Sequence, residues 1–308
     1  MPSQKTVFVT GATGNQGGGV VRHSLRAGHK VFALVRDPAS AAAKELSALG
    51  AELVHGDLDN VPVLTSSIAN NSIDAVFHIQ PRPNPPNVKV ELQQTQNVVN
   101  AARASEKVKT MIISSVFGAE RYKTFPQWGT PDFPLDPAYW EAKSGIEDIV
   151  RNAGFENWTI IRPVFFLQLL TPPGSRYVFP GFSREDRTLR VAFKPDTKIA
   201  WIDGADAGVA AAAVIANPEK YRGKGIDLAV EALTIGDIAE KMSRALGEEV
   251  KLHYFTDEEA KAAMKTHVIG GHFFGNQVPS AAAVEASREF ASELTSVDDF
   301  FVKNKGVI

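Results

Sequence analysis

Three glycines placed between the first expected strand and the first expected helix constrain this fold more than any other feature. The apolar run "TVFVTG" (Thr6–Gly11) is typical of a buried strand, and a helix is expected over Gln16–Ala27. Between them, Gly11, Gly14 and Gly17 give the pattern G-x-x-G-x-x-G. Such a turn needs glycine to bend sharply, to let a pyrophosphate approach the backbone and to pack the helix closely. The next two glycines, Gly18 and Gly19, are expected to bring the helix close to the sheet. The pattern therefore predicts a dinucleotide site at a helix N-terminus.

Apolar runs alternate with amphipathic stretches through the first half of the chain. Further buried strands are expected at Lys30–Arg36, Ala51–Asp57, Ser72–Gln80, Lys109–Ser115 and Trp158–Pro163. Strands that are apolar on both faces and separated by helices indicate a parallel sheet covered on both sides. The predicted fold class is α/β, a Rossmann doubly wound parallel sheet with a smaller C-terminal α/β substrate lobe.

The regular alternation fades after Pro163, where proline, glycine and aromatic residues become frequent. Two later helices are expected to begin at Thr234 and Thr256, each followed three residues on by an acid. We expect an NAD(P)-binding domain over 1–164 plus about 204–232. The small substrate-binding lobe then comprises about 165–203 plus 233–308.

Composition excludes several classes of function. The 308 residues carry a formal net charge of −2, so no basic field favours direct binding of nucleic acid. The absence of cysteine excludes disulfides, thiolate nucleophiles and cysteine zinc sites. The seven histidines lack metal-ligand spacing, and no metal is expected. No apolar run approaches the roughly 18 residues of a membrane span, and no secretory leader is recognised. We expect a cytoplasmic protein, monomeric or homodimeric, whose partner is a small-molecule substrate.

The end of the second strand bears on which dinucleotide is bound. An NAD-binding chain usually places an acid there for the ribose 2′-hydroxyl, whereas this strand ends in Arg36, whose guanidinium fits a 2′-phosphate. The next residue, Asp37, is expected to cap a helix that has Pro38 at its first position and ends near Gly50. The expected cofactor is NADP(H). Asp57 follows the third strand, where it would contact the adenine, cap the next helix, or do both.

A tyrosine and a lysine four residues apart suggest acid–base chemistry. Tyr139 and Lys143 lie in "DPAYWEAK" and would share one helix face. A lysine ammonium below the phenol, with a nicotinamide cation above it, would favour the phenolate and lower its pKa from about 10. Ser115, at the end of the fifth strand, would hold a substrate oxygen. The pattern Y-x-x-x-K also arises by chance, and a surface helix with an aromatic residue beside a lysine is the alternative.

Taken together, the motifs "VTGATGNQGGGVVR", "ALVRDP", "GDLDN", "TQNVVNAA" and "TIIRPVFF" resemble the NmrA-like branch of the short-chain dehydrogenase/reductase superfamily. The resemblance implies a Rossmann lobe and a small lobe that closes a substrate cleft. It implies that the pyrophosphate is held by Gly11, Thr13, Gly14, Asn15, Gln16 and Gly17. It implies that Arg36 holds the 2′-phosphate and that the nicotinamide end is lined by Gln80, Lys143 and Pro163 to Phe165. Gln168 departs from the asparagine that related reductases often have.

The family divides between reductases and redox-sensing regulators that lack the active tyrosine, so Tyr139 favours an enzyme. The leading hypothesis is an NADPH-dependent reductase of a carbonyl, enone or imine on an aromatic or secondary-metabolite-like molecule. One alternative is an enzyme with the same cofactor that catalyses a non-redox condensation, cyclisation or isomerisation. The other is a non-catalytic NADP(H) sensor. The expected substrate contacts are Trp128, Trp140, Phe166 and Phe274, the last in "GGHFFGNQ", interpreted as a flexible loop. His272 in this loop would be a second acid or base, or merely a polar loop residue.

Overall fold

The computed structural model describes residues 3–308, which form two compact units. Unit 1 comprises the residues up to Tyr122, Ala138–Pro163 and Gly204–Ile226. Unit 2 comprises Lys123–Pro137, Val164–Asp203 and Asp227–Ile308. The segment Lys123–Pro137 groups with unit 2, whereas the sequence placed it in the nucleotide-binding lobe.

Unit 1 is built on a seven-stranded sheet with the strand order β10-β6-β5-β4-β1-β2-β3. Its strands are β1 (Thr6–Val9), β2 (Lys30–Val35), β3 (Glu52–His55), β4 (Ala75–Ile79), β5 (Thr110–Ser114), β6 (Asn157–Pro163) and β10 (Lys224–Leu228). Strands β1 to β6 pair in parallel, with Phe8 opposite both Phe32 and Val76. The order reverses between β1 and β4, the place where doubly wound sheets bind ligands at the carboxyl ends of their strands. The predicted α/β fold with a mostly parallel sheet is confirmed.

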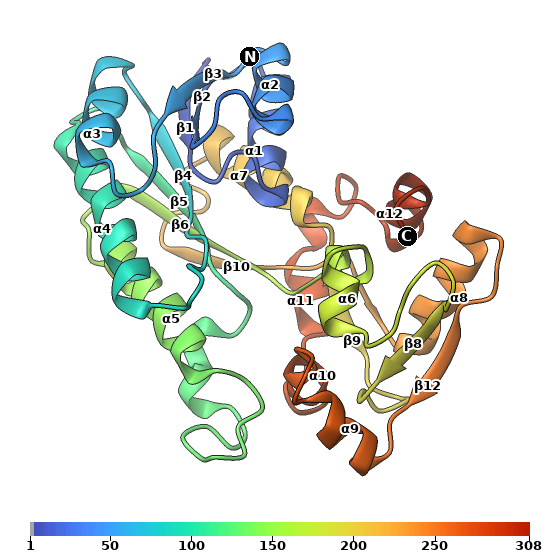
Figure 1. The fold of residues 1–308 in the computed structure, drawn as a ribbon. Helices are drawn as coiled ribbons and strands as arrows, with labels where there is room; N and C mark the ends of the chain where they lie inside the picture. Colours follow the sequence, from blue (N-terminus) through green and yellow to red (C-terminus); the bar gives the residue numbers. More distant parts are fainter. Residues whose placement is uncertain (1–2) are drawn as a thin grey trace. The chain divides into compact units, whose positions relative to one another are not determined.

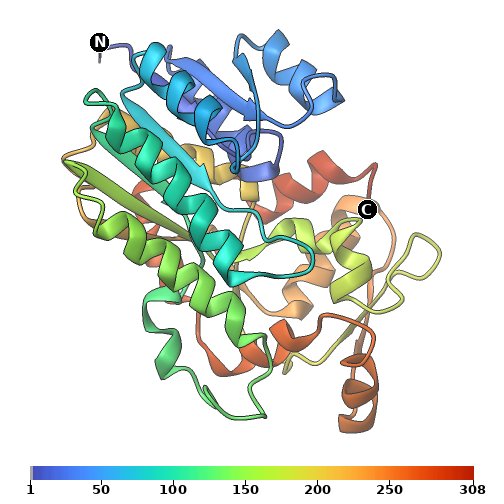
Figure 2. The ribbon, with the colours of Figure 1, turned by 60° about the vertical axis from the view of Figure 1, so that its left-hand side comes forward.

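Helices cover both faces of this sheet (Figure 1). One face carries α1 (Asn15–Arg26) and α7 (Ala207–Ala216). The other carries α3 (Val61–Asn70), α4 (Val88–Ala104) and α5 (Pro137–Arg151), which lie side by side in Figure 2. Val98 of α4 and Ile146 of α5 are buried with Phe8, Val76 and Met111 in the core on this second face. The apolar runs read from the sequence therefore become strands buried on both sides.

The glycines of α1 bring two helices, rather than a helix and the sheet, into close contact. A Cβ on Gly19 would lie 2.0 Å from the carbonyl oxygen of Ala205, just before α7. A Cβ on Gly208 would in turn lie 2.4 Å from the carbonyl oxygen of Gly19. The expectation that Gly19 serves contact with the sheet is wrong, because the backbone that it approaches belongs to the start of α7.

Two expected helix caps are displaced by three residues. Helix α2 (Ala41–Ala48) begins after Ser40, whose side chain accepts from the N–H of Ala43. Asp37 instead closes the preceding turn by accepting from the N–H of Ala39 at 2.8 Å. Asp57 likewise accepts from the N–H groups of Asp59 and Asn60, both at 2.9 Å.

The cap of α3 is Asn60. In both places the acid stabilises the turn that leads into the helix, and a later polar residue caps the helix.

Unit 2 contains two small sheets, β11-β9-β7 and β12-β8. Its strands are β7 (Phe165–Phe166), β8 (Thr188–Val191), β9 (Ile199–Ile202), β11 (Glu231–Leu233) and β12 (Lys251–Tyr254). Its helices are α6 (Gly174–Val178), α8 (Ile235–Leu246), α9 (Asp257–Ala263), α10 (Gly270–Gln277), α11 (Ala282–Ala286) and α12 (Val297–Asn304). Short 3-10 helices lie at Leu167–Leu170 and Arg288–Phe290 in this unit, at Gly204–Asp206 in unit 1, and at Ala119–Thr124, where the chain passes from unit 1 to unit 2. The unit has a core of its own, which includes the fully buried Trp201, Phe179 and Phe301.

The sequence signals in unit 2 had mixed outcomes. Thr234 and Thr256 form the expected capping boxes with Asp237 and Glu259. The stretch "GGHFFGNQ" is helix α10, so its interpretation as a flexible loop is wrong. Within this helix His272 is fully buried and accepts from the N–H of Ala192 through Nδ1 at 3.2 Å. A Cβ on Gly270 would lie 2.0 Å from the carbonyl oxygen of Pro134, so this glycine serves close packing rather than flexibility.

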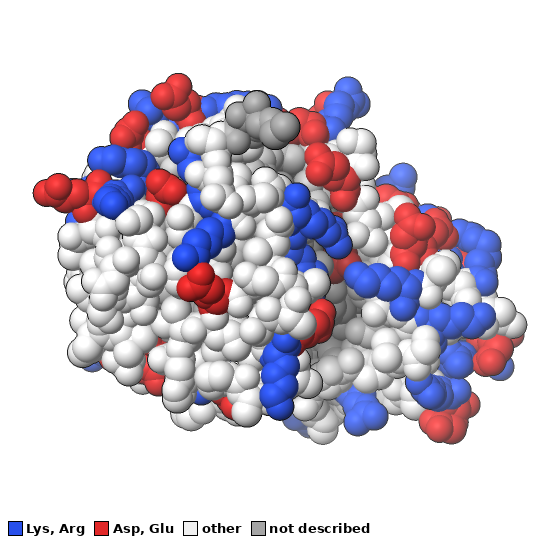
Figure 3. All heavy atoms as spheres, turned by 90° about the horizontal axis from the view of Figure 1, so that it is seen from above, with Lys and Arg blue, Asp and Glu red and all other residues white. Residues whose placement is uncertain are grey.

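The surface carries charges of both signs. Figure 3 shows acidic and basic side chains intermixed with uncharged ones over one face of the molecule. Among residues 3–308, no helix combines the length and the apolar character that crossing a membrane requires.

Candidate functional site

The glycine turn between β1 and α1 is held in a geometry that the fold enforces at two of its three glycines. Gly11 has φ +60°, and a Cβ there would lie 2.4 Å from Cγ2 of Ile79 on β4. A Cβ on Gly17 would lie 2.2 Å from the carbonyl oxygen of Gly11, which also accepts from the N–H of Gly14 at 3.0 Å. These two glycines are therefore required by the turn itself.

Gly14 differs, because the protein backbone leaves room for a side chain there. The nearest atom to a Cβ on Gly14 is the carbonyl oxygen of Gly11 at 3.4 Å, an ordinary contact. Gly14 is the N-cap of α1 and offers no side chain to the helix. The first N–H groups of a helix have no acceptor within it, and they attract anions. Gly14, Asn15 and Thr13 are exposed, so an anion can reach this end of α1 from solvent.

Arg36 follows β2 and Asp57 follows β3, two strands on the same side of the switch point. Arg36 comes directly after β2 and is exposed. Asp57 is exposed too, with one carboxylate oxygen occupied by its turn. Both residues therefore lie after the carboxyl ends of strands on the β2–β3 side of β1, in the region where the adenosine half of a dinucleotide binds in this fold class.

Two serines at the end of β5 have different surroundings. Ser114 donates from Oγ to Oε1 of Gln16 at 2.5 Å, which ties β5 to the first turn of α1. Ser115 is buried, and its Oγ has no hydrogen-bond partner among the described residues. The side-chain Oε1 of Gln80, the residue after β4, is also buried and has no hydrogen-bond partner among the described residues. Buried polar atoms usually have partners, so these two are available to a ligand or to water.

Tyr139 and Lys143 share one face of α5, and both lie near Gln80 or its loop. The Nζ of Lys143 is 5.7 Å from the centre of the Tyr139 ring and donates to the carbonyl oxygen of Gln80 at 3.2 Å. The guanidinium of Arg82 lies 5.3 Å from the same ring. Tyr139 is half-buried, while Lys143 is buried. The structure thus brings together the residues expected to form the acid–base pair.

The electrostatics of this pair differ from those expected. Burial raises the pKa of Tyr139 to about 12, although the charge of Arg82 acts in the opposite direction. Lys143 is 3.6 Å from Oε2 of Glu91, so much of its positive charge is neutralised. Burial lowers the pKa of Lys143, and Glu91 partly offsets this effect. The shift of the Tyr139 pKa is opposite in direction to the one expected: burial is its largest cause, Glu91 adds to it, and the opposing charge is that of Arg82.

Glu91 is the site residue that the sequence reasoning missed. It lies in the first turn of α4 and is 1% exposed. It occupies the same helix face as the buried Thr95, Val98 and Ala102. A single acid on a buried helix face is costly without a partner, so its spacing was a usable signal.

The remaining predicted contacts are distributed over both units. Pro163 ends β6 in unit 1 and is buried. Trp140 of α5 is 2% exposed, and its ring packs edge-on against Tyr139 at 5.5 Å. Trp140 is thus buried, and its role as a substrate contact stays a prediction.

The aromatic residues of unit 2 pack mainly on one another. Phe165 is 5.8 Å from the ring of Trp201, and Trp128 is 5.0 Å from Phe133. Phe274 is buried and lies 5.0 Å from Phe125. Phe166 is half-buried.

Gln168, also in unit 2, donates to a carboxylate oxygen of Asp203 at 2.6 Å. Within residues 3–308, no three histidine, aspartate or glutamate side chains are grouped so as to hold a metal ion.

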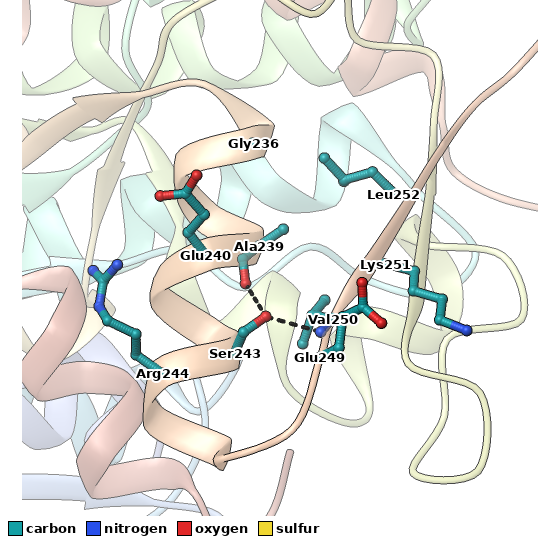
Figure 4. Close-up of a pocket in the computed structure, with 9 residues that line it drawn as sticks. All are labelled: Gly236, Ala239, Glu240, Ser243, Arg244, Glu249, Val250, Lys251 and Leu252. Carbon is teal, nitrogen blue, oxygen red and sulfur yellow. Dashed lines mark hydrogen bonds between the residues drawn. The ribbon is translucent and has the colours of Figure 1, made fainter.

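A shallow hollow on unit 2 lies between α8 and β12 (Figure 4). Its lining includes Glu240, Arg244 and Lys251, and Ser243 bridges the helix to the strand. The Oγ of Ser243 donates to the carbonyl oxygen of Ala239 and accepts from the N–H of Val250. None of the residues predicted for the site lines this hollow.

The fold and the glycine turn define a Rossmann-type α/β protein with a site for a dinucleotide. The chain belongs to the NmrA-like family, whose model matches residues 3–300.

Among curated relatives, an NAD(P)H azoreductase from Xenophilus azovorans is 28% identical over 258 residues, covering 84% of this chain and 80% of the relative. Among solved structures, the triphenylmethane reductase of Citrobacter sp. complexed with NADP(H) superposes with a TM-score of 0.74 at 20% identity, covering 97% and 99% of the two chains. NmrA, a negative transcriptional regulator in complex with NADP, superposes with a TM-score of 0.73 at 21% identity, covering 97% and 95%. The fold is thus shared by reductases and by a regulator.

Proposed function

We propose that this protein is an NADPH-dependent reductase of a carbonyl, enone or imine group on an aromatic or secondary-metabolite-like molecule. The observation that carries the proposal is the open turn at Gly14, at the switch point of the sheet, on the same unit as the Tyr139–Lys143 pair. The names of two relatives, an azoreductase and a triphenylmethane reductase, support reduction of aromatic compounds.

The residues of unit 1 fit NADP(H). The uncapped start of α1, with Gly14 and the neighbouring Thr13 and Asn15 exposed, suits the pyrophosphate. The exposed guanidinium of Arg36 suits the 2′-phosphate. Gln80, whose buried Oε1 lacks a partner, suits the carboxamide end of the nicotinamide. When bound, the cofactor would supply the hydride.

Tyr139 would act as the proton donor of the reaction. A phenol with a pKa of about 12 is protonated throughout the neutral range, as reduction of a carbonyl or imine requires. Lys143 would hold the ribose hydroxyls, and the unpaired Oγ of Ser115 would orient the substrate oxygen or nitrogen. The proposed substrate contacts stay Trp140 of unit 1 and Trp128, Phe166 and Phe274 of unit 2.

Replacing Tyr139 by phenylalanine tests this role. Tyr139→Phe removes the proton donor and keeps the ring, so kcat should fall by about 10²-fold or more while the NADPH Kd stays unchanged. The measurement is steady-state NADPH oxidation with a carbonyl or imine substrate, together with fluorescence titration of NADPH. Full turnover by Tyr139→Phe would remove Tyr139 from the mechanism.

A regulatory function is the second candidate, favoured by one observation. Glu91 neutralises Lys143, and the phenol is not activated, so the pair could serve packing alone in a protein that senses the NADP(H) redox state. This alternative predicts a partner protein whose affinity differs between NADP⁺ and NADPH, with no turnover of any substrate. A non-redox enzyme would instead convert substrate with no change in NADPH absorbance.

A further inference from the structure

Glu91 is a buried acid, and a buried carboxylate is unfavourable unless it has a partner. It lies in the first turn of α4, 1% exposed, and its Oε2 has no hydrogen-bond partner among the described residues. Among the described residues, its carboxylate forms an ion pair with the Nζ of Lys143 at 3.6 Å. Removing one partner of a buried ion pair leaves an uncompensated charge in the interior and is strongly destabilising. The two residues therefore depend on each other.

Lys143 is held on two sides, and neither contact is with Tyr139. Its Nζ reaches the carbonyl oxygen of Gln80 at 3.2 Å and the carboxylate of Glu91 at 3.6 Å. The centre of the Tyr139 ring is farther away, at 5.7 Å. Two further ionisable groups of unit 1 lie near Lys143. Arg82 lies beside the Tyr139 ring, and His78 is buried and neutral because burial and the Lys143 charge lower its pKa.

A directional hydrogen-bond chain fixes the backbone that carries Glu91. The Oγ1 of Thr95 donates to the carbonyl oxygen of Glu91 at 3.0 Å, so at Nε2 of His78, 3.2 Å away, it must accept. His78 is then the neutral Nε2–H tautomer, and its Nδ1 accepts from Oγ1 of Thr10 at 2.9 Å. Thr10 directly precedes Gly11. The chain thus connects the start of the glycine turn to the helix turn that holds the acid.

We propose that Glu91 is a positioning residue of the proposed reductase site, the buried counter-ion that holds Lys143 as an ammonium beside Gln80. The ammonium–carboxylate pair carries no net charge, so it leaves Tyr139 as a neutral phenol that donates a proton to the product. This inference rests on the proposed function only for its consequence in catalysis. The ion pair itself is testable without cofactor or substrate.

The test is a titration of the Lys143 amine by NMR. The protein is labelled with ¹³C-lysine, the signal is assigned with Lys143→Arg, and its pH midpoint is compared between wild type and Glu91→Gln. The amide is similar in size but uncharged, so the Lys143 midpoint should fall by about 1–3 pH units, as expected for loss of an opposite charge at this distance. Glu141→Gln is the matched control, because Glu141 is exposed on the same helix as Lys143 and should leave the midpoint unchanged.

An unchanged midpoint in a folded Glu91→Gln protein would overturn the proposal. If Glu91→Gln fails to fold by circular dichroism, Glu91→Asp keeps the charge but shortens the side chain by one methylene. It should give a smaller downward shift, and an unchanged midpoint there would equally overturn the inference. A shifted midpoint in a protein that reduces no substrate would leave the ion pair established and would count against the reductase function instead.

Discussion

At the scale of single residues, the acid–base pair shows how neighbours decide the chemistry of a motif. The sequence places Tyr139 and Lys143 on one helix face, and the structure agrees. Their pKa values, however, are shifted first by burial and then by charges from other elements, among them Glu91 of α4. The spacing of two residues within one helix does not reveal how deeply they are buried or which charges other helices place beside them. The direction of the pKa shift of Tyr139 could therefore not be predicted.

Arg36 allows a prediction on cofactor choice at the same scale. Arg36→Asp replaces a cation that suits the 2′-phosphate by an anion that repels it, so NADPH binding should weaken at least about tenfold while NADH binding is spared. Fluorescence titration with both cofactors measures this ratio. Arg22→Ala is a suitable control, since Arg22 pairs with Glu45 on the surface. Unchanged NADPH affinity in Arg36→Asp would show that the 2′-phosphate is held elsewhere.

At the scale of elements, most of unit 1 could be predicted and its local caps could not. The apolar runs match β1 to β6, and the glycine pattern lies between β1 and α1 as expected. Helix α2, however, begins at Ala41 rather than after Asp37, because Asp37 and Ser40 are both good caps and the turn satisfies Asp37 first. In unit 2, glycines at 270 and 275 suggested a loop, but they are the positions where α10 packs closely against other segments. Close approach of distant backbone is a tertiary property that composition does not reveal.

Gly19 in α1 and Gly14 at its N-cap are predicted to have different roles, Gly19 in packing and Gly14 in cofactor binding. Gly19→Ala places a methyl group 2.0 Å from a backbone oxygen, so the free energy of unfolding should drop by about 1–3 kcal/mol or more. Gly14→Ala fits sterically and should cost about 1 kcal/mol or less as a poorer N-cap. The same variant should weaken NADPH binding at least tenfold, since a methyl group would stand where the pyrophosphate approaches. Chemical denaturation and NADPH titration of both variants measure the two effects. Equal losses of stability, or full NADPH affinity in Gly14→Ala, would contradict this division.

At the scale of the whole molecule, the chain combines a parallel-sheet unit with a second unit that has its own core. The glycine turn, Arg36, Tyr139, Lys143 and Glu91 all belong to unit 1. The proposed contacts to the cofactor and the proton donor are thus carried by one compact body. Of the aromatic residues proposed for substrate, Trp128, Phe166 and Phe274 belong to unit 2, where the regular alternation of strands and helices is lost. Substrate identity is accordingly the least predictable property of the sequence.

One measurement tests the central claim, that this protein reduces an aromatic substrate with hydride from NADPH. A panel of aromatic carbonyl, enone and imine compounds is incubated with NADPH deuterated at the transferred position, while absorbance and product mass are followed together. The account predicts that at least one compound consumes NADPH in equal amount and gains one deuterium on carbon. Conversion of substrate without NADPH oxidation or deuterium in the product would contradict it, as would the absence of turnover across the panel by a protein that binds NADPH.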